Sequence, residues 1–584
     1  MKTKKVLGVA AAALLVVTGC SAGGQNSATG NAPKAEVSNV SVDKDGAESK
    51  GPAKEVPGAR KGGIITPLWR QDQTHYDPAQ IQTSPDQSIS ELIERRLTMY
   101  KVVDGRTILV GDLATNAGET TDGGKTWKYT LKDGVKYSDG SPISAKDIKY
   151  AVARSFSSKY ARGFQYIQSW LVDSEDPSSV YPGPYDGGEL SNDKVEAPDD
   201  KTVIFKFSKP RTDFPFAAAL GGTVPVPQAK DTKEGLDQSP ITSGPYKIAS
   251  HEVDKSLTLV KNDQWDPNTD AVRHQYVDGF TFQFGPQIAE VTDRLSASAG
   301  NDKNSISIWA AIAPERLDQV MNDPKLKPQV LDQATSASEV YSINTQRITD
   351  LNVRKALLVA FPKEQARTTK GGPFAGDFST TLGSPANAGW KKYDIPGITD
   401  VDPKGDPVKA KQMLTDAGKL GQSISLGYNQ TPAGEKEALA VADGLEKAGF
   451  KVEKIPMQAK TFNDSRDTVD NHLDLYWSSW AADWPTGVTV YPEVYDGRKI
   501  GDGRPNNSHF NDPAVNAEID RILTISDLAE QGAEFAKLDQ KIMEQVPAIP
   551  YLYTRRELMV GSNVGGASVD SHTVTNLANL FLKS

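Results

Sequence analysis

The chain has 584 residues, which is enough for several domains with large buried cores. Its hydrophobic content of 38% and charged content of 24% are typical of a globular protein that folds in water. The formal net charge of -9 argues against nucleic acid as a partner, because nucleic-acid-binding proteins carry a basic stripe. The single cysteine, Cys20, excludes an intramolecular disulfide.

Residues 1–20 have the pattern of a lipoprotein signal peptide. Three lysines lie among the first five residues, and the apolar run from Val6 to Thr18 that follows is too short to span a bilayer comfortably. The run ends in Val17-Thr18-Gly19-Cys20, which resembles a bacterial lipobox, where the thiol is lipidated and the chain is cut before it. The alternative is an ordinary signal peptide with an incidental cysteine. We expect a lipidated Cys20, because the only cysteine stands at the end of the apolar run and a polar stretch follows.

Residues 21–60 are predicted to be a flexible linker. They are rich in Gly, Ala, Ser, Asn, Pro and Lys and contain no aromatic residue, so they lack the side chains needed for a core. Folded sequence is expected to begin near Lys61. No later segment is long and apolar enough to cross a membrane.

The segment from Thr126 to Phe156 predicts a strand, two turns and a helix. Apolar and polar residues alternate from Trp127 to Leu131, as in a half-buried strand, and two Asp-Gly turn signals follow. Ser144 and Asp147 have the spacing of a capping box, and apolar residues at helical spacing come next.

A second regular pattern follows Asp406. A helix is predicted from Val408 to Ala417, a strand from Ile424 to Tyr428, a helix from Glu435 to Ala448, and a strand from Phe450 to Met457. Strands that alternate with helices in this way indicate a parallel βαβ unit.

The most unusual stretch is Leu473 to Tyr495, which reads LDLYWSSWAADWPTGVTVYPEVY. It begins like a strand and is broken by Pro485 and Gly487, so Asp483 should lie just beyond a strand, in a loop walled by indole rings. A carboxylate in such surroundings needs a positive partner, because burial of a lone charge is costly. The partner is either a Lys or Arg of the protein or a cation of the ligand.

Searches for catalytic and metal-binding motifs find none. The Gly124-Lys125-Thr126 sequence mimics the end of a P-loop, but Glu119 stands where that motif needs glycine. The chain contains no Gly-x-Ser-x-Gly elbow, and no two of its six histidines have metal-ligand spacing. We therefore interpret the protein as a binder without catalytic residues, metal or cofactor.

Several segments, in the same order, resemble the oligopeptide and dipeptide-binding family of ABC-transporter solute receptors (family 5). The likeness covers nearly all of residues 62–584. The segments that carry it are GGIITPLWRQDQTHYDPAQ, WKYTLKDGVKYSDGSPISAKDIKYAVARSF, ITSGPYKI, KNDQWD, EVTDRLSASAG, VRKALLVAF, DPVKAKQMLTDAG, HFNDPAVNAEIDRIL and VPAIPYLYTRREL.

This resemblance implies an α/β fold of the type II periplasmic-binding-protein class, with two lobes and an extra subdomain on the first. The implied boundaries are residues 61–107, 199–310 and 547–584 for lobe I, 108–198 for its subdomain, and 311–546 for lobe II. Hinges between the lobes are expected near Ala310 and Val546, so that the lobes close on the ligand.

The resemblance also implies a site. Peptide-binding members have a Trp-x-x-Asp arrangement whose acid meets the peptide's N-terminal ammonium, and here it is Trp480-Ala481-Ala482-Asp483. Ala481 would offer backbone groups to an extended peptide. Trp480, and less surely Trp484, would wall side-chain pockets. From the first lobe, the aligned contact segment is Gln82, Thr83 and Ser84.

The expected role is therefore that of a lipid-anchored, monomeric receptor on the extracytoplasmic face of the cell membrane, which delivers oligopeptides to an ABC permease. No Arg between Leu473 and Asp483 offers itself to a peptide carboxylate, so the preferred peptide length stays open. Some members carry oligosaccharides or chelated nickel, and these are the alternatives. An enzyme is the rival from another class, but no nucleophile–base pair supports it.

Overall fold

The computed structural model describes residues 40–103, 106–159, 163–309, 312–570, 572 and 574–584. The predicted signal peptide, Cys20 and the linker up to residue 39 lie outside this range. None of the helices in the described part combines the length and the apolar composition needed to cross a bilayer.

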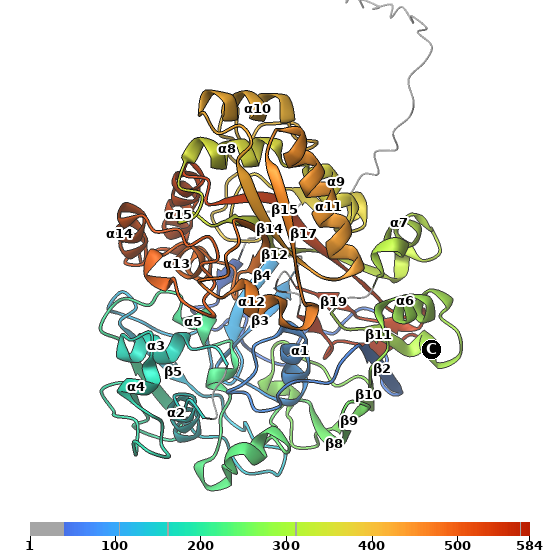
Figure 1. Cartoon of the computed structure of the whole chain (residues 1–584). Coiled ribbons are helices and arrows are strands. Elements are labelled where there is room, and N and C mark those ends of the chain that lie inside the picture. Colours follow the sequence, from blue (N-terminus) through green and yellow to red (C-terminus); the bar gives the residue numbers. More distant parts are fainter. Residues whose placement is uncertain (1–39, 104–105, 160–162, 310–311, 571, 573) are drawn as a thin grey trace, which may run out of the picture. The chain divides into compact units, whose positions relative to one another are not determined.

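Lobe II is built on a six-stranded sheet of order β13-β17-β12-β16-β14-β15. Helices α8, α9 and α11 contact one another or the sheet, and α10 packs on α8 (Figure 1). The strands are β13 (Gly376–Phe378), β17 (Ala548–Met559), β12 (Val330–Ile343), β16 (Leu475–Ala481), β14 (Ser423–Asn429) and β15 (Lys451–Met457). The helices are α8 (Leu351–Ala360), α9 (Lys363–Thr368), α10 (Pro407–Asp416), α11 (Pro432–Lys447), α12 (Phe462–Arg466), α13 (Tyr491–Val494), α14 (Pro513–Ile522) and α15 (Leu528–Met543).

The predicted βαβ unit is confirmed. β14 and β15 pair in parallel, and α11 connects them and contacts both. Gly418 follows α10 with a φ of +65°, the left-handed conformation that glycine adopts most easily at a helix end.

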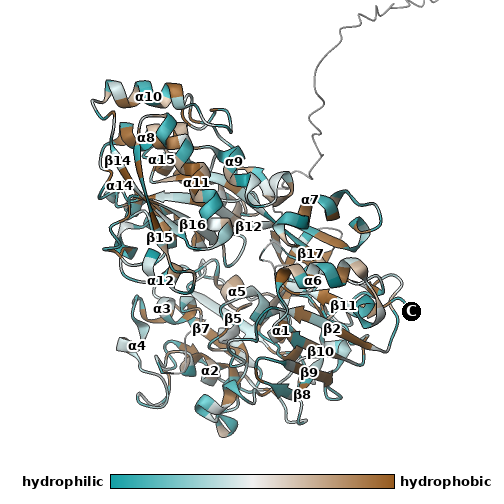
Figure 2. Cartoon of the chain, turned by 45° about the vertical axis from the view of Figure 1, so that its right-hand side comes forward, coloured by the Kyte–Doolittle hydropathy of each residue, from teal (hydrophilic) through white to brown (hydrophobic). Residues whose placement is uncertain are grey.

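Lobe I is built on a five-stranded sheet of order β11-β2-β10-β9-β8. Its strands are β11 (Ser305–Ser307), β2 (Ile64–Trp69), β10 (Gly279–Phe284), β9 (Ser256–Lys261) and β8 (Tyr246–Glu252). Its helices are α1 (Ser84–Ile93), α6 (Ile288–Ala297) and α7 (Pro314–Asn322), and its C-terminal segment forms the short strands β18 (Val564–Gly565), β19 (Ser568–Val569), β20 (Thr575–Asn576) and β21 (Phe581–Leu582). Hydrophobic residues concentrate on the central strands of both lobes, whereas the outer helix faces are hydrophilic (Figure 2).

The subdomain contains the predicted strand and helix. β5 (Thr126–Thr130) pairs with β7 (Thr202–Lys206), which also pairs with β6 (Val195–Glu196). The predicted capping box is confirmed, because Ser144 and Asp147 exchange hydrogen bonds at the start of α2 (Ala145–Arg154). The remaining helices are α3 (Tyr166–Val172), α4 (Pro177–Val180) and α5 (Phe214–Ala217). The subdomain therefore continues past residue 198, where its end was predicted, since β7 completes its sheet.

The predicted linker is wrong for residues 40–60. β1 (Val40–Val42) pairs in parallel with β4 (Arg106–Gly111), which also pairs with β3 (Thr98–Val103). Asp43 and Ser49 are buried and hydrogen-bonded to each other at 2.5 Å. Backbone pairing along an existing strand orders this segment, although its composition offers few side chains for a core.

The lobes are joined by β12 and β17, which pair over most of their length, with irregularities between Ala334 and Ser338 and next to Glu339. The first half of β17 lies in the lobe II sheet, whereas Leu558 and Met559 pack with residues of β2, α6 and α7. The crossings thus lie inside these strands. The predicted position at Val546 is too early, and α7 belongs with lobe I, not lobe II. Ala310 lies outside the described residues.

Candidate ligand-binding site

The site is centred on Asp483, which follows the end of β16 as the sequence predicted. Thr489 fixes the loop, because its hydroxyl accepts the Asp483 backbone N–H at 3.1 Å and its carbonyl accepts the Trp480 indole N–H at 2.5 Å. Ser336 of β12 donates a hydrogen bond to the Ala482 carbonyl at 3.2 Å. The carboxylate is therefore held on a loop tied to the lobe II sheet.

The Asp483 carboxylate is half-buried and lacks a positive partner among the described Lys and Arg side chains. Tyr166 of the subdomain donates its hydroxyl hydrogen bond to Asp483 Oδ2 at 2.5 Å. Burial raises the pKa of Asp483 to about 7, and the negative charge of Glu493 acts in the same direction, whereas the hydrogen bond from Tyr166 opposes both. The site thus favours either a proton or an added cation.

Trp484 lies behind Asp483 and is 0% exposed. Its ring meets Tyr166 edge to face at a centroid distance of 4.6 Å, and its indole N–H donates to Asp213 Oδ2 at 2.5 Å. Thr486 donates to the same oxygen. Burial raises the pKa of Asp213 to about 6, against those two hydrogen bonds. In this structure Trp484 therefore connects the subdomain with lobe II, and its predicted contact with a ligand stays a prediction.

Ala481 is exposed at the end of β16 and pairs with Ala337 of β12. On the opposite side, β14 pairs with β16 only at Leu475 and Tyr476. In the described part of the chain, no strand covers that side from Trp477 to Ala481, and Trp480 is half-buried beside it. This stretch of strand edge is a surface to which an extended chain can add.

The predicted contacts from lobe I lie at the start of α1. Thr83 caps this helix by accepting the backbone N–H of Asp86, and Ser84 donates to the His572 carbonyl at 2.7 Å. Gln82 and Thr83 are exposed. The hydrogen bonds of Thr83 and Ser84 stay within lobe I, so their ligand contacts, with that of Gln82, stay predictions.

Sequence reasoning missed Tyr166, Asp213 and Glu493. Tyr166 is separated from Asp483 by 317 positions, and no local pattern links the two. Aromatic residues at Phe164, Tyr166 and Trp170 were the available signal, but such a cluster is usual in a core.

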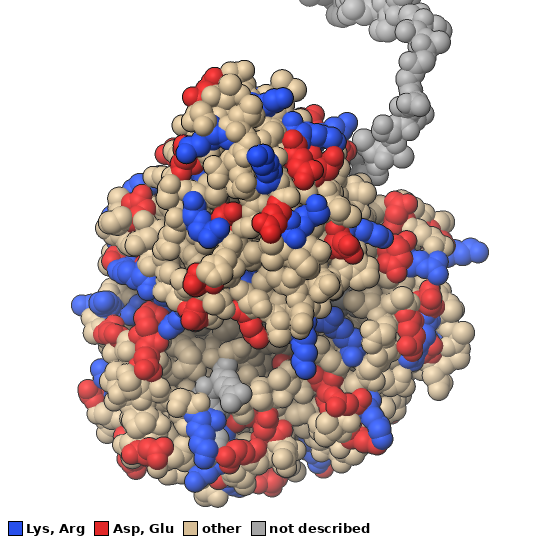
Figure 3. Space-filling model, in the orientation of Figure 1, with Lys and Arg blue, Asp and Glu red and all other residues tan. Residues whose placement is uncertain are grey.

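Within the described residues, no three His, Cys, Asp or Glu side chains are grouped so that they could hold a metal ion. Lys and Arg are interspersed with Asp and Glu on the face shown in Figure 3, which is hollowed between its upper and lower parts.

Residues 109–502 match the family model described as bacterial extracellular solute-binding proteins, family 5 middle. The chain belongs to this family. It is 25% identical over 513 residues to the periplasmic oligopeptide-binding protein OppA of Escherichia coli strain K12, covering 84% of this chain and 87% of that protein. The structure of clavulanic acid biosynthesis oligopeptide binding protein 2 matches with a TM-score of 0.82 and 28% identity, covering 90% of this chain and 96% of the other. The Escherichia coli murein tripeptide binding protein MppA has the same fold, with a TM-score of 0.70, 21% identity, and coverage of 90% and 98%.

These comparisons confirm the predicted family and its two-lobed type II fold. Members of family 5 are receptors for transport and not enzymes, so this chain is a binding protein.

The raised pKa of Asp483 predicts a pH-dependent affinity for ligands with a free amino terminus. Below about pH 7 the carboxyl is protonated and cannot pair with an ammonium, so affinity should fall by up to about tenfold per pH unit. Above about pH 8 the ligand's own amino group loses its proton, and affinity should fall again. Calorimetry from pH 5 to pH 9 measures both limbs. Asp483→Asn should remove the acid limb, and a wild-type profile as flat as that variant's would contradict the assignment.

Proposed function

We propose that the protein is a lipid-anchored, monomeric receptor on the extracytoplasmic face of the cell membrane, which binds oligopeptides and delivers them to an ABC importer permease. The observation that carries the proposal is Asp483, a half-buried carboxylate without a cationic partner among the described residues, at the end of an uncovered strand edge. Relatives named for oligopeptide binding support it.

The chemistry of a peptide fits these features. Its N-terminal ammonium would pair with Asp483 in a charge-assisted hydrogen bond, next to the Tyr166 hydroxyl. Its backbone would extend along the edge that ends at Ala481, as an added strand. Trp480, half-buried beside that edge, would contact the side chains of the peptide.

The decisive variant is Asp483→Asn, which keeps the shape of the side chain and removes its charge. A buried ammonium would then lose its partner, which typically costs about 2–5 kcal/mol, so peptide affinity should fall by about 30-fold or more. Acetylation of the peptide's amino terminus should produce the same loss in the wild type and little further loss in the variant, because both changes remove one interaction. Calorimetry on the four combinations measures this coupling.

Thr489→Val is a suitable companion, since it alters the loop beside Asp483 without removing charge. If the acetylated peptide binds the wild type as tightly as the free peptide, Asp483 is structural. An oligosaccharide, which needs stacked rings and hydrogen bonds but no cation partner, then becomes the better candidate ligand.

The anchor is tested separately at Cys20. Cys20→Ala removes the thiol that a lipid would modify, so the protein should move from the membrane fraction to the soluble extracytoplasmic fraction. Ser27→Ala, in the polar stretch that follows, is the matched control and should stay on the membrane. Equal membrane retention of the Cys20 variant and the control would refute lipidation.

A further inference from the structure

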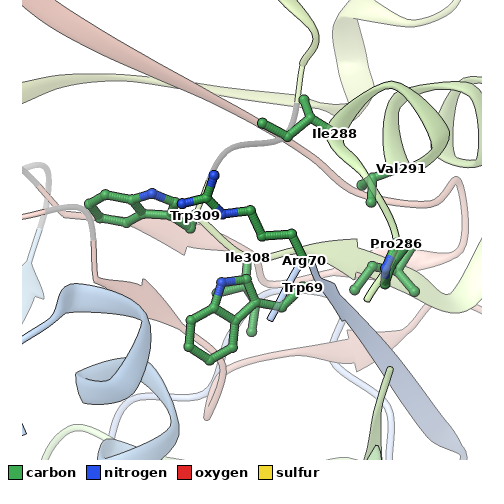
Figure 4. Close-up of a pocket in the computed structure, with 8 residues that line it drawn as sticks. Trp69, Arg70, Pro286, Ile288, Val291, Ile308 and Trp309 are labelled. Carbon is green, nitrogen blue, oxygen red and sulfur yellow. The ribbon is translucent and has the colours of Figure 1, made fainter. Parts of the chain in front are cut away.

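A second charged site lies on lobe I, where three parallel strands end together. β10 and β11 both pair in parallel with β2, so the carboxyl ends of these strands lie at one edge of the sheet. Arg70 follows β2, Pro286 follows β10, and Trp309 follows β11, and all three line one small hollow (Figure 4). The carboxyl edge of parallel strands is the usual place for ligands in open α/β sheets.

Trp309 has a strained backbone. Its φ is +75°, in the left-handed region that bulky side chains seldom adopt. The guanidinium carbon of Arg556, from β17, lies 4.1 Å from the centroid of the Trp309 ring, and its Nη1 donates to the Trp309 carbonyl at 3.3 Å. Strain of this kind persists where the surroundings hold it, and it concentrates at functional sites.

Arg70 and Arg556 form a pair of guanidinium groups without a counter-ion. No carboxylate among the described residues lies within ion-pair distance of either group, whereas the adjacent Arg555 is paired with Asp332 at 2.6 Å. Burial lowers the pKa of Arg556, and the charge of Arg70 does so too, although Glu557 and Glu339 oppose them at longer range. Arg70 is exposed, and its side chain extends toward the Trp309 indole (Figure 4).

The register of the sheet gives the separation between this pair and the Asp483 site. Ala481 is opposite Ala337 of β12, and Arg556 is opposite Gln333 of the same strand. Four residues along a strand span about 13 Å, and two strand spacings add about 10 Å across the sheet, which gives a diagonal of about 16 Å. Because an extended chain covers about 3.3–3.6 Å per residue, a peptide of about four to six residues bridges the two sites.

We propose that Arg70 and Arg556, against Trp309, bind the C-terminal carboxylate of a peptide whose amino terminus is at Asp483. This inference rests on the proposed function and adds to it the far end of the ligand. Arginine suits the role, because its planar fork binds both oxygens of a carboxylate. The receptor would then select peptides of about four to six residues by engaging both ends at once, as the diagonal above requires.

The test compares peptides of five residues with a free or an amidated carboxyl terminus, by calorimetry at neutral pH. Amidation should weaken binding to the wild type by about tenfold or more, since it removes hydrogen bonds to charged groups. Arg70→Met and Arg556→Met should each bind the free acid about as weakly as the wild type binds the amide. In both variants amidation should add little further loss.

Arg316→Met is the matched control, because it removes the same charge from an exposed position on α7 that is paired with Asp293 at 3.2 Å. It should keep the full effect of amidation. A dipeptide, too short to reach both sites, should show no effect of amidation in the wild type.

The outcomes separate this inference from the proposed function. If amidation has no effect on the wild type while N-terminal acetylation still weakens binding, the carboxylate site is refuted and the receptor remains a peptide binder. If amidation weakens the Arg70 variant as much as the wild type, the site is also refuted. If neither end of the peptide matters, the proposed function fails together with this inference.

Discussion

The charge of Asp483 is the constraint on which the site depends. A carboxylate withdrawn from water is costly to keep ionised, and here its pKa rises to about 7 because the described neighbours supply a tyrosine hydroxyl and no cation. A purely structural acid is usually paired within its own protein, as Asp112 is with Arg95 and Arg273. Asp483 instead offers its charge to whatever enters beside it. A ligand ammonium gains from that arrangement, whereas a neutral ligand does not.

The same constraint gives meaning to the contacts between the subdomain and lobe II. Tyr166 reaches Asp483, and Asp213 accepts hydrogen bonds from Trp484 and Thr486, so both sides of this junction meet at one loop. The long strands β12 and β17 connect the lobes on another side, and their pairing register relates the Asp483 loop to Arg556. Two sites of opposite charge thus lie on one continuous sheet, which is the arrangement that a ligand with two charged ends requires.

Local patterns predicted the elements that local interactions form. The capping box at Ser144, the βαβ unit from β14 to β15 and the loop after β16 all follow from spacing within a few residues. The lobe boundaries did not, because β12 and β17 each serve both lobes and their sequences carry no mark at the crossing. β1 was missed since its order comes from pairing with β4 and not from its own side chains. Within the site, Asp483 could be found from its indole-rich surroundings, but Tyr166 and the Arg70–Arg556 pair come together only through the folded chain.

The most direct test of peptide binding is to let the receptor choose. The purified protein is incubated with an equimolar pool of oligopeptides of two to eight residues and defined oligosaccharides, unbound material is removed, and the retained ligand is released by denaturation and identified by mass spectrometry. We expect peptides with free termini, most of them about four to six residues long, as the span between the two sites requires. Retention of oligosaccharides while the peptides wash away would contradict the account.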